Sequence, residues 1–275
     1  MRAASVAFID GTDHRIPAFP RGARRWRSIM SRLDGRKAMV TGGSRGIGAG
    51  IVRKLAAAGA DVGFTYRERR DAAEAVLKDV KKQDRKGVAF QADSADPQAL
   101  TAAVDKVAES LGGLDIFVSS AGVLLFKPIE EFSVDDFEQM VRVDLRAAFI
   151  GSKAALRYMP TNGRIIFISS NIADYAALPT TALYSMVKCG LDGLMKGMAR
   201  DLGPKKITVN CVHPGPIATD ANPADGQYSK QLKAFMATPE FGEPADVGGL
   251  VAYLASDEAH FVSGATHRID NGFTA

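Results

Sequence analysis

The sequence predicts an α/β protein built on one parallel sheet with helices on both faces. Three observations support this fold class. Short apolar segments alternate with segments of helical period along most of the 275-residue chain, which is typical of βαβ units. Segments such as "RIIFI" (164–168) are apolar on both faces, as strands covered by helices on both sides require. A glycine-rich turn also joins the first strand to the first helix.

The elements follow one another in a regular order. Strands are expected at 36–41, 61–66, 87–92, 114–122, 163–170, 206–212 and 265–270. Helices are expected at 46–59, 71–84, 97–113, 134–158, 182–202 and 244–255, and a long loop at 214–240. Because crossovers between parallel strands are right-handed, this alternation predicts a single doubly wound, Rossmann-type sheet. The sequence shows no internal repeat, no linker and no second domain.

Proline and glycine residues mark the ends of two of the expected helices. The helix at 97–113 begins with Pro97, whose missing N–H costs nothing in a first turn, and ends at Gly112. Between these two residues, apolar side chains recur every three or four positions. Gly59 closes the helix at 46–59 in the same way.

Composition and charge exclude several classes of protein. The chain has a formal net charge of +4, but residues 1–33 alone contribute +5, from seven arginines and two aspartates, so the rest carries −1. The body therefore has no overall basic surface for nucleic acid. No apolar run approaches the roughly 18 residues that a membrane span needs. Two cysteines form neither a metal pair nor a disulfide framework, which favours a cytoplasmic location.

Residues 1–33 differ from the rest of the chain. They combine clustered arginines and two prolines with no sustained apolar period, and they lack the apolar region of a secretory signal. We expect a basic N-terminal extension, mainly a tail, followed by one dinucleotide-binding catalytic domain over 34–275. An arginine-rich transit peptide and a natural start at Met30 remain alternatives.

The glycine-rich turn "TGGSRGIG" (41–48) has the chemistry of a dinucleotide site. Gly42, Gly46 and Gly48 permit a tight turn and a close approach of the backbone to a pyrophosphate, which the helix N-terminus then faces. The same stretch also matches the G-x-S-x-G pattern of serine hydrolases, with Ser44 as the nucleophile. Against a hydrolase, Gly48 would have no role, and no oxyanion segment of the HGGG type is present.

The stretch "ALYSMVK" (182–188) places Tyr184 four residues before Lys188. On a helix these side chains share one face, so the ammonium lies beside the phenol. A free tyrosine has a pKa near 10, and a neighbouring positive charge lowers it, which suits an acid that exchanges protons near neutrality.

Four separated motifs together resemble the short-chain dehydrogenase/reductase family. They are "TGGSRGIG", "SSAG" (119–122), "ISS" with "YSMVK", and "VNCVHPGPIATD" (209–220), in the family's order and at its spacings. The resemblance covers about 34–275 and is strongest to 3-oxoacyl-acyl-carrier-protein reductases and fungal naphthol reductases. It implies an enzyme that interconverts a ketone and a secondary alcohol with a nicotinamide cofactor. It also implies homo-oligomers, tetramers or dimers, formed through the helices at 134–158 and 182–202.

The resemblance also assigns roles to residues. Tyr184 would give a proton to the substrate oxygen, Ser170 would hydrogen-bond that oxygen, and Lys188 would also hold the nicotinamide ribose. Ser169 is the competing serine, but the family pattern selects the second of the pair. The implied cofactor-binding set is Gly42, Ser44, Arg45, Gly46, Ile47, Gly48, Tyr66, Arg67, Asp93, Ser94, Ser120, Ala121, Gly122, Tyr184, Lys188, Pro214, Gly215, Ile217 and Thr219.

Two positions depart from the family pattern. Asp144 stands where the family has a catalytic asparagine, and an ionised aspartate accepts hydrogen bonds but donates none. This departure puts the proton relay in doubt and motivates an alternative function, a nucleotide-binding regulator with weak turnover. "SSAG" stands where the family has an asparagine-containing motif, and its small side chains should still let the backbone pass close to the cofactor.

The end of the second strand favours NADP(H) over NAD(H). An acid at this position would bind a ribose 2′-hydroxyl, but Tyr66 stands there and Arg67 follows. Together with Arg45 in the glycine turn, Arg67 offers guanidinium groups to a 2′-phosphate. Glu68 is the counter-indication, since a shift of one residue would make it the ribose acid.

The loop at 214–240 is long enough for a functional lid over a substrate. Its apolar residues would form the inner face of the lid: Tyr228, Leu232, Phe235 and Met236. The opposite wall would come from Leu124, Leu125, Ile172 and Leu178. No arginine cluster marks a charged substrate, so a small, largely apolar carbonyl compound or alcohol is expected. Tyr175 is expected at the substrate mouth, and His213 is expected to be structural.

Overall fold

The computed structural model describes residues 32–275 and shows one seven-stranded sheet in the order β3-β2-β1-β4-β5-β6-β7. All six neighbouring pairs are parallel. The strands are β1 (Lys37–Val40), β2 (Asp61–Tyr66), β3 (Gly87–Gln91), β4 (Ile116–Ser119), β5 (Arg164–Ile168), β6 (Thr208–Pro214) and β7 (Thr266–Ile269). The predicted doubly wound fold is therefore confirmed.

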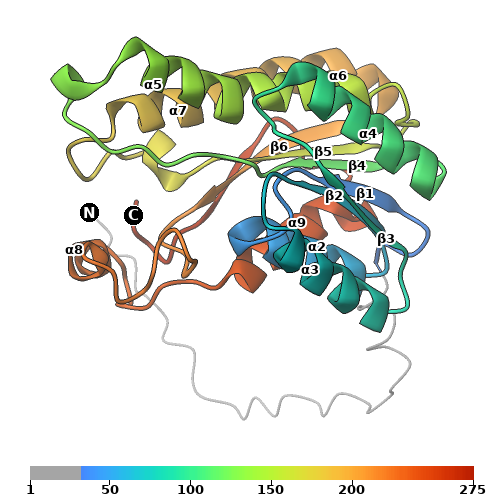
Figure 1. Cartoon of the computed structure of the whole chain (residues 1–275), viewed down its shortest axis with the longest axis horizontal. Coiled ribbons are helices and arrows are strands. Elements are labelled where there is room, and N and C mark those ends of the chain that lie inside the picture. Colours follow the sequence, from blue (N-terminus) through green and yellow to red (C-terminus); the bar gives the residue numbers. More distant parts are fainter. Residues whose placement is uncertain (1–31) are drawn as a thin grey trace, which may run out of the picture.

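Helices cover both faces of the sheet (Figure 1). One layer holds α2 (Gly46–Ala57), α3 (Arg70–Lys82) and α9 (Pro244–Ala255). The other holds α4 (Pro97–Leu111), α5 (Val134–Met140), α6 (Ala147–Ala155) and α7 (Ala182–Leu202). Short 3-10 turns lie at η1 (Ile129–Glu131), η3 (Asn171–Ala173), η4 (Gly203–Lys205) and η5 (Asp257–Ala259). None of the helices within residues 32–275 is both long and apolar enough to cross a membrane.

Two buried apolar clusters lie against the two faces of the sheet, because successive strand residues point in opposite directions. Val40 belongs to the cluster that includes residues of α2, whereas its neighbour Met39 belongs to the cluster that includes residues of α4. This division explains why the strands are apolar at consecutive positions. Both layers of helices are therefore required to shield the sheet from water.

Two elements differ from the sequence prediction. The run expected as one helix over 134–158 is interrupted by a π-helical segment, η2 (Val141–Arg146), and ends at Ala155. The expected loop at 214–240 contains a short helix, α8 (Ser229–Ala234), which lies beside the C-terminus of the chain (Figure 1). Neither feature has a sequence signal as strong as those of the longer helices, because both are shorter than two turns.

The strand order reverses between β1 and β4, so the segments that follow these two strands lie side by side. Thr41 ties them together: its backbone N–H donates to the carbonyl of Val118 over 3.0 Å. Its Oγ1 accepts the N–H groups of Ser120 and Ala121 at 3.0 and 3.1 Å. In open α/β sheets this reversal point is the place where ligands bind.

The expected extension, residues 1–33, lies outside the described residues except for Arg32 and Leu33. Leu33 is completely buried in the core, and its N–H donates to the carbonyl of Ala58 over 2.8 Å. Arg32 forms a 2.9 Å ion pair with Glu258. The described structure therefore includes contacts from Arg32 and Leu33, which precede the predicted boundary at 34.

A shortened chain that begins at Met30 should keep its melting temperature within about a few degrees of the full chain, because it retains the buried Leu33. The same shortened chain with Leu33→Ala should lose about 2–5 kcal/mol of unfolding free energy. Thermal and urea unfolding of the three proteins measure both effects. A large loss on shortening alone would show that residues before Met30 contribute to the folded domain.

Candidate active site

Tyr184 and Lys188 lie on one face of α7, as their spacing predicts. The side chain of Lys188 is almost completely buried, and its Nζ lies 5.4 Å from the centre of the Tyr184 ring. The same Nζ donates to the carbonyl oxygen of Ile168, at the end of β5, over 3.3 Å. The ammonium therefore lies between the catalytic tyrosine candidate and the carboxyl end of the sheet.

Asp144 supplies the counter-charge for this buried ammonium. Its Oδ1 lies 2.9 Å from Nζ of Lys188, and its side chain is fully shielded from solvent. Oδ2 accepts the N–H of Val123 at 3.1 Å. A Cβ on Gly122 would lie 2.8 Å from Oδ1, so the glycine leaves the room that the ion pair occupies. Asp144 stands in the π-helical segment η2, and π-helical segments are frequent at functional sites.

The surroundings shift the pKa values of both Tyr184 and Lys188. Burial raises the pKa of Tyr184, the charge of Lys188 lowers it, and the charge of Asp144 raises it, so the pKa is raised overall. Burial acts to lower the pKa of Lys188, but the interactions with Asp144 and Tyr184 together outweigh it and raise that pKa. Lys188 is therefore a stable cation, and Asp144 offsets part of its effect on the phenol. In the protein alone, Tyr184 is a neutral proton donor.

The two neighbouring serines have different partners. Ser169 is buried and its Oγ donates to the backbone carbonyl of Lys188 over 3.0 Å, which fixes α7 against the end of β5. Ser170 is partly exposed, and its Oγ accepts the N–H of Ile172 at 3.3 Å. A hydrogen bond from the Ser170 side chain also acts to lower the pKa of Tyr184. Of the two serines, Ser170 is the one that influences the phenol, and its catalytic role stays a prediction.

The glycine turn forms a cradle that side chains would fill. Gly42 has φ +68°, and a Cβ there would lie 3.0 Å from Cα of Ala121. A Cβ on Gly48 would lie 2.2 Å from the carbonyl oxygen of Gly42. The helix α2 that follows has no side-chain cap on its first turn and no acidic residue there. Its N-terminal N–H groups are therefore available to a pyrophosphate, and the turn fits this ligand.

The remaining cofactor-binding candidates lie along the same edge of the sheet. Ser44, Arg45 and Ile47 are accessible in the turn and first helical residues, while Asp93 and Ser94 follow β3. Pro214 ends β6, and Gly215 packs so closely on Asp270 that a Cβ would lie 2.7 Å from its Cα. A Cβ on Gly46 would lie 3.4 Å from Cγ2 of Thr219, so these two distant residues meet at the turn.

An open pocket of about 520 Å³ lies next to the expected 2′-phosphate position. Its lining residues are Arg67, Asp93, Ala95, Asp135, Gln139, Arg142 and Val143. Tyr66 is buried, whereas Arg67 is half exposed and forms a 2.9 Å ion pair with Glu68. Glu68 therefore neutralises Arg67 in this structure, and a phosphate would compete with it for the guanidinium.

Apolar residues surround Tyr184 and the expected lid. Phe126, which the sequence analysis did not single out, meets the Tyr184 ring edge to face at 5.7 Å. Leu125 and Tyr184 pack against one buried cluster. In the lid, Phe235 contacts Phe273 and Tyr175, with ring centres 5.2 and 6.4 Å apart. Met236 is buried, whereas Tyr228 is half exposed.

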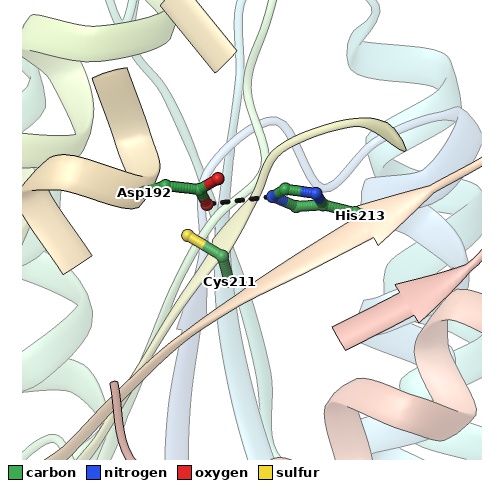
Figure 2. A group of neighbouring side chains, drawn as sticks. All are labelled: Asp192, Cys211 and His213. Atoms are coloured by element: carbon green, nitrogen blue, oxygen red, sulfur yellow. Dashed lines mark hydrogen bonds and ion pairs between the residues drawn. The ribbon is translucent and has the colours of Figure 1, made fainter. Parts of the chain in front are cut away.

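Asp192, Cys211 and His213 form a compact cluster beneath this site (Figure 2). Nε2 of His213 lies 2.9 Å from Oδ1 of Asp192. These two atoms are closer together than two ligands of a tetrahedral zinc ion, which would be about 3.3 Å apart when each lies about 2.0 Å from the metal. Burial raises the pKa of the Cys211 thiol, which opposes the thiolate that a metal would need. The cluster is therefore a hydrogen-bonded network, and the contact is a charge-assisted hydrogen bond.

The hydrolase alternative finds no support in the described residues. His213 directs both ring nitrogens at carboxylates, His260 directs Nδ1 at the carbonyl of Asp257, and the buried Nε2 of His267 has no hydrogen-bond partner. No histidine of residues 32–275 is paired with Ser44, so this serine has no base there.

Comparisons with known proteins agree over nearly the whole chain. A family model described as enoyl-(acyl carrier protein) reductase matches residues 42–274. The cyclic-di-GMP-binding biofilm dispersal mediator protein of Escherichia coli is 42% identical over 90% of this chain and 100% of its own. A versicolorin reductase of Emericella nidulans is 37% identical over 88% of this chain and 96% of its own. The structure of a short-chain dehydrogenase from Burkholderia cenocepacia, in complex with NADP, matches with a TM-score of 0.87 and 43% identity, over 89% of this chain and 100% of that one.

Proposed function

The chain belongs to the short-chain dehydrogenase/reductase family, and from this premise we propose that it is an NADP(H)-dependent carbonyl reductase. Its reaction would interconvert a ketone and a secondary alcohol on a small, largely apolar substrate. The observation that carries the proposal is the grouping of Ser170, Tyr184 and Lys188 at the carboxyl end of β5, beside a turn that fits a dinucleotide.

The side chains have distinct roles in this proposal. The cofactor, when bound, supplies the hydride. Tyr184 donates its phenolic proton to the substrate oxygen, and Ser170 hydrogen-bonds that oxygen and stabilises the charge that develops on it. The positive charge of Lys188 stabilises the phenolate that remains on Tyr184. Asp144 keeps Lys188 protonated but reduces the net positive charge near the phenol.

Three features support NADP(H) as the cofactor. The related Burkholderia cenocepacia dehydrogenase was solved in complex with NADP. No acid occupies the end of β2, where Tyr66 stands. Arg67 lines the pocket that also contains Asp93, Arg45 is exposed in the glycine turn, and guanidinium groups bind phosphates in a bidentate manner.

The apolar contacts of Tyr184 support the proposed substrate class. Phe126 meets the phenol ring, Leu125 packs against the same buried cluster as Tyr184, and Phe235 of the expected lid contacts Tyr175 at the expected substrate mouth. We propose further that the protein forms homo-oligomers, and half-exposed apolar side chains such as Phe149 on α6 are compatible with this.

A second candidate function is a nucleotide-binding regulator with weak turnover. The name of the Escherichia coli relative, a cyclic-di-GMP-binding mediator, favours it, and so does Asp144 at the place of the family's asparagine. Oxidation of NADPH with a panel of apolar ketones separates the two functions. A robust rate with one ketone supports the reductase, whereas no rate combined with tight binding of cyclic-di-GMP supports the regulator.

The variant Tyr184→Phe should reduce ketone turnover by at least about a hundredfold, because it removes the proton donor and keeps the ring. Binding of NADPH, measured by fluorescence titration, should persist. Tyr253→Phe, on the exposed surface of α9, is the matched control and should keep full activity. A Tyr184→Phe protein with half the wild-type rate would show that another group protonates the substrate.

The double variant Arg45→Ala/Arg67→Ala should weaken NADPH binding by about 1.5–3 kcal/mol for each charged hydrogen bond lost. Binding of NADH, which lacks the 2′-phosphate, should barely change. Calorimetric titration with both dinucleotides makes the comparison, and Arg70→Ala, an exposed arginine on α3, serves as the control. Equal losses for the two dinucleotides would assign the arginines to a different part of the cofactor.

The variant Asp144→Asn should shift the pH profile of alcohol oxidation to lower pH. In the wild type the carboxylate raises the pKa of Tyr184, and oxidation needs the phenolate, so removing the negative charge lets the phenolate form at lower pH. The measurement is the oxidation rate of one alcohol against pH for both proteins. Superimposable profiles would show that the charge of Asp144 has no electrostatic effect on Tyr184.

A further inference from the structure

One buried histidine connects three segments of the proposed active site. His213 lies in β6 directly before Pro214, and its side chain is fully buried. Its Nδ1 lies 3.0 Å from Oδ2 of Asp174, which follows the Ser170 segment and η3. Its Nε2 lies 2.9 Å from Oδ1 of Asp192 on α7 (Figure 2). Since Asp192 comes four residues after Lys188, it extends the face of α7 that carries the catalytic pair.

This geometry defines the charge of the histidine. An ionised carboxylate only accepts hydrogen bonds, so each ring nitrogen must carry a hydrogen, and an imidazole with two N–H groups is a cation. Burial acts to raise the pKa of Asp174, but hydrogen bonds from Arg268 and His213 outweigh it and lower that pKa. Burial acts to lower the pKa of His213, but Asp192 and Asp174 together raise it. The ring is therefore an imidazolium between two carboxylates.

The groups around the ring are consistent with this charge. On β7, Nε of Arg268 lies 2.8 Å from Oδ2 of Asp174, and Oγ1 of Thr266 donates to Asp192 over 3.4 Å. His267, also on β7, has a pKa that burial and the charge of His213 both lower, so it is neutral. Further titratable neighbours are Cys211 on β6 and Cys189 on α7, whose pKa values are raised by burial first and by nearby aspartates second, and Lys196, one turn beyond Asp192 on α7. The carboxylates of Asp174 and Asp192 thus pair with the cations His213 and Arg268, and Lys196 adds a further positive charge nearby.

We propose that His213 is a positioning residue, which as an imidazolium links the Ser170 segment, the catalytic helix α7 and the cofactor strand β6 into one unit. The inference rests on the proposed reductase function. Loss of one ring proton would leave a bare nitrogen facing a carboxylate and break one of the two links. Ser170 would then no longer be held at a fixed position relative to Tyr184.

The charge is tested first, without any activity measurement. In the full-length protein labelled with nitrogen-15 histidine, both ring nitrogens of His213 should remain protonated at about pH 8, where an unperturbed histidine is neutral. The resonances are assigned by their loss in His213→Asn, and exposed His260 provides the internal reference. A His213 ring with one unprotonated nitrogen at this pH overturns the proposal.

The positioning role is tested with two uncharged variants. His213→Asn places an amide near the Nδ1 position and keeps a donor to Asp174, whereas His213→Gln keeps a donor to Asp192. Each should lower kcat by roughly 10- to 100-fold, the scale on which a small misplacement of reacting groups acts, with the KM for NADPH changed by less than about twofold. His260→Asn should leave both constants unchanged. Wild-type kcat in both uncharged variants overturns the positioning role.

Asp174→Asn gives a pH signature that a merely structural role would not. With one of its two carboxylates neutralised, His213 should lose its proton at lower pH, so the alkaline fall of kcat should begin earlier than in the wild type. The melting temperature of Asp174→Asn should also begin to fall at a lower pH than that of the wild type. The raised pKa of His213 adds stability that is complete below about pH 6.5, the pKa of the unfolded chain, and this stability is lost as the pH rises through the pKa of the folded protein. Unchanged pH profiles overturn the proposal. If the wild type reduces no ketone, the reductase function is refuted. The nitrogen resonances alone then show whether His213 is charged.

Discussion

A positive charge buried next to the reacting phenol is the constraint on which the proposed active site depends. An isolated ammonium in such a place would be neutralised or would destabilise the fold by several kcal/mol. Lys188 avoids this because Asp144 comes within 2.9 Å and the carbonyl of Ile168 accepts a hydrogen bond. The pair requires a glycine at 122, a helix bulged at 141–146 and a strand that ends at Ile168. Residues far apart in the sequence are thus fixed by one electrostatic requirement.

A second requirement comes from the turn after β1. The backbone must approach a dinucleotide, so glycines stand at 42, 43, 46 and 48, and these positions offer no side chains for packing. Threonine hydroxyls and backbone groups hold it instead: Thr41 accepts two N–H groups from the segment after β4, and Oγ1 of Thr65 accepts the N–H of Gly42. The cradle is therefore tied to the neighbouring segments by hydrogen bonds, although half of its residues are glycines.

Much of this arrangement was predictable from the sequence. The alternating pattern gives the strands and long helices to within a few residues, and the spacing of Tyr184 and Lys188 places them on one helical face. Ser170 influences the phenol whereas Ser169 is bound to the backbone of α7, and the catalytic role that the family pattern gives Ser170 stays a prediction. These features depend on local periodicity or on short motifs, which a sequence displays directly.

Contacts between distant segments were not predictable in the same way. Asp144 stood out in the sequence only as a departure from the family pattern, whereas the structure places its Oδ1 2.9 Å from Nζ of Lys188. His213 was interpreted as structural, and its partners Asp174 and Asp192 were not noticed, because the pairing becomes visible only when β6, η3 and α7 are packed together. Phe126 and the buried Leu33 were missed for the same reason.

The π-helical segment η2 makes the chain sensitive to length as well as to composition. A π-helical turn contains one residue more than the α-helical turn that it replaces, and each residue of a helix turns the following side chain by about 100°. Removing one residue of Val141–Arg146 other than Asp144 would let a regular α-helix form, which is the more stable local conformation. That helix would turn the side chain at 144 away from Lys188 or rotate α6 against α4. A single codon deletion here would therefore preserve every chemical group of the site while separating its charges.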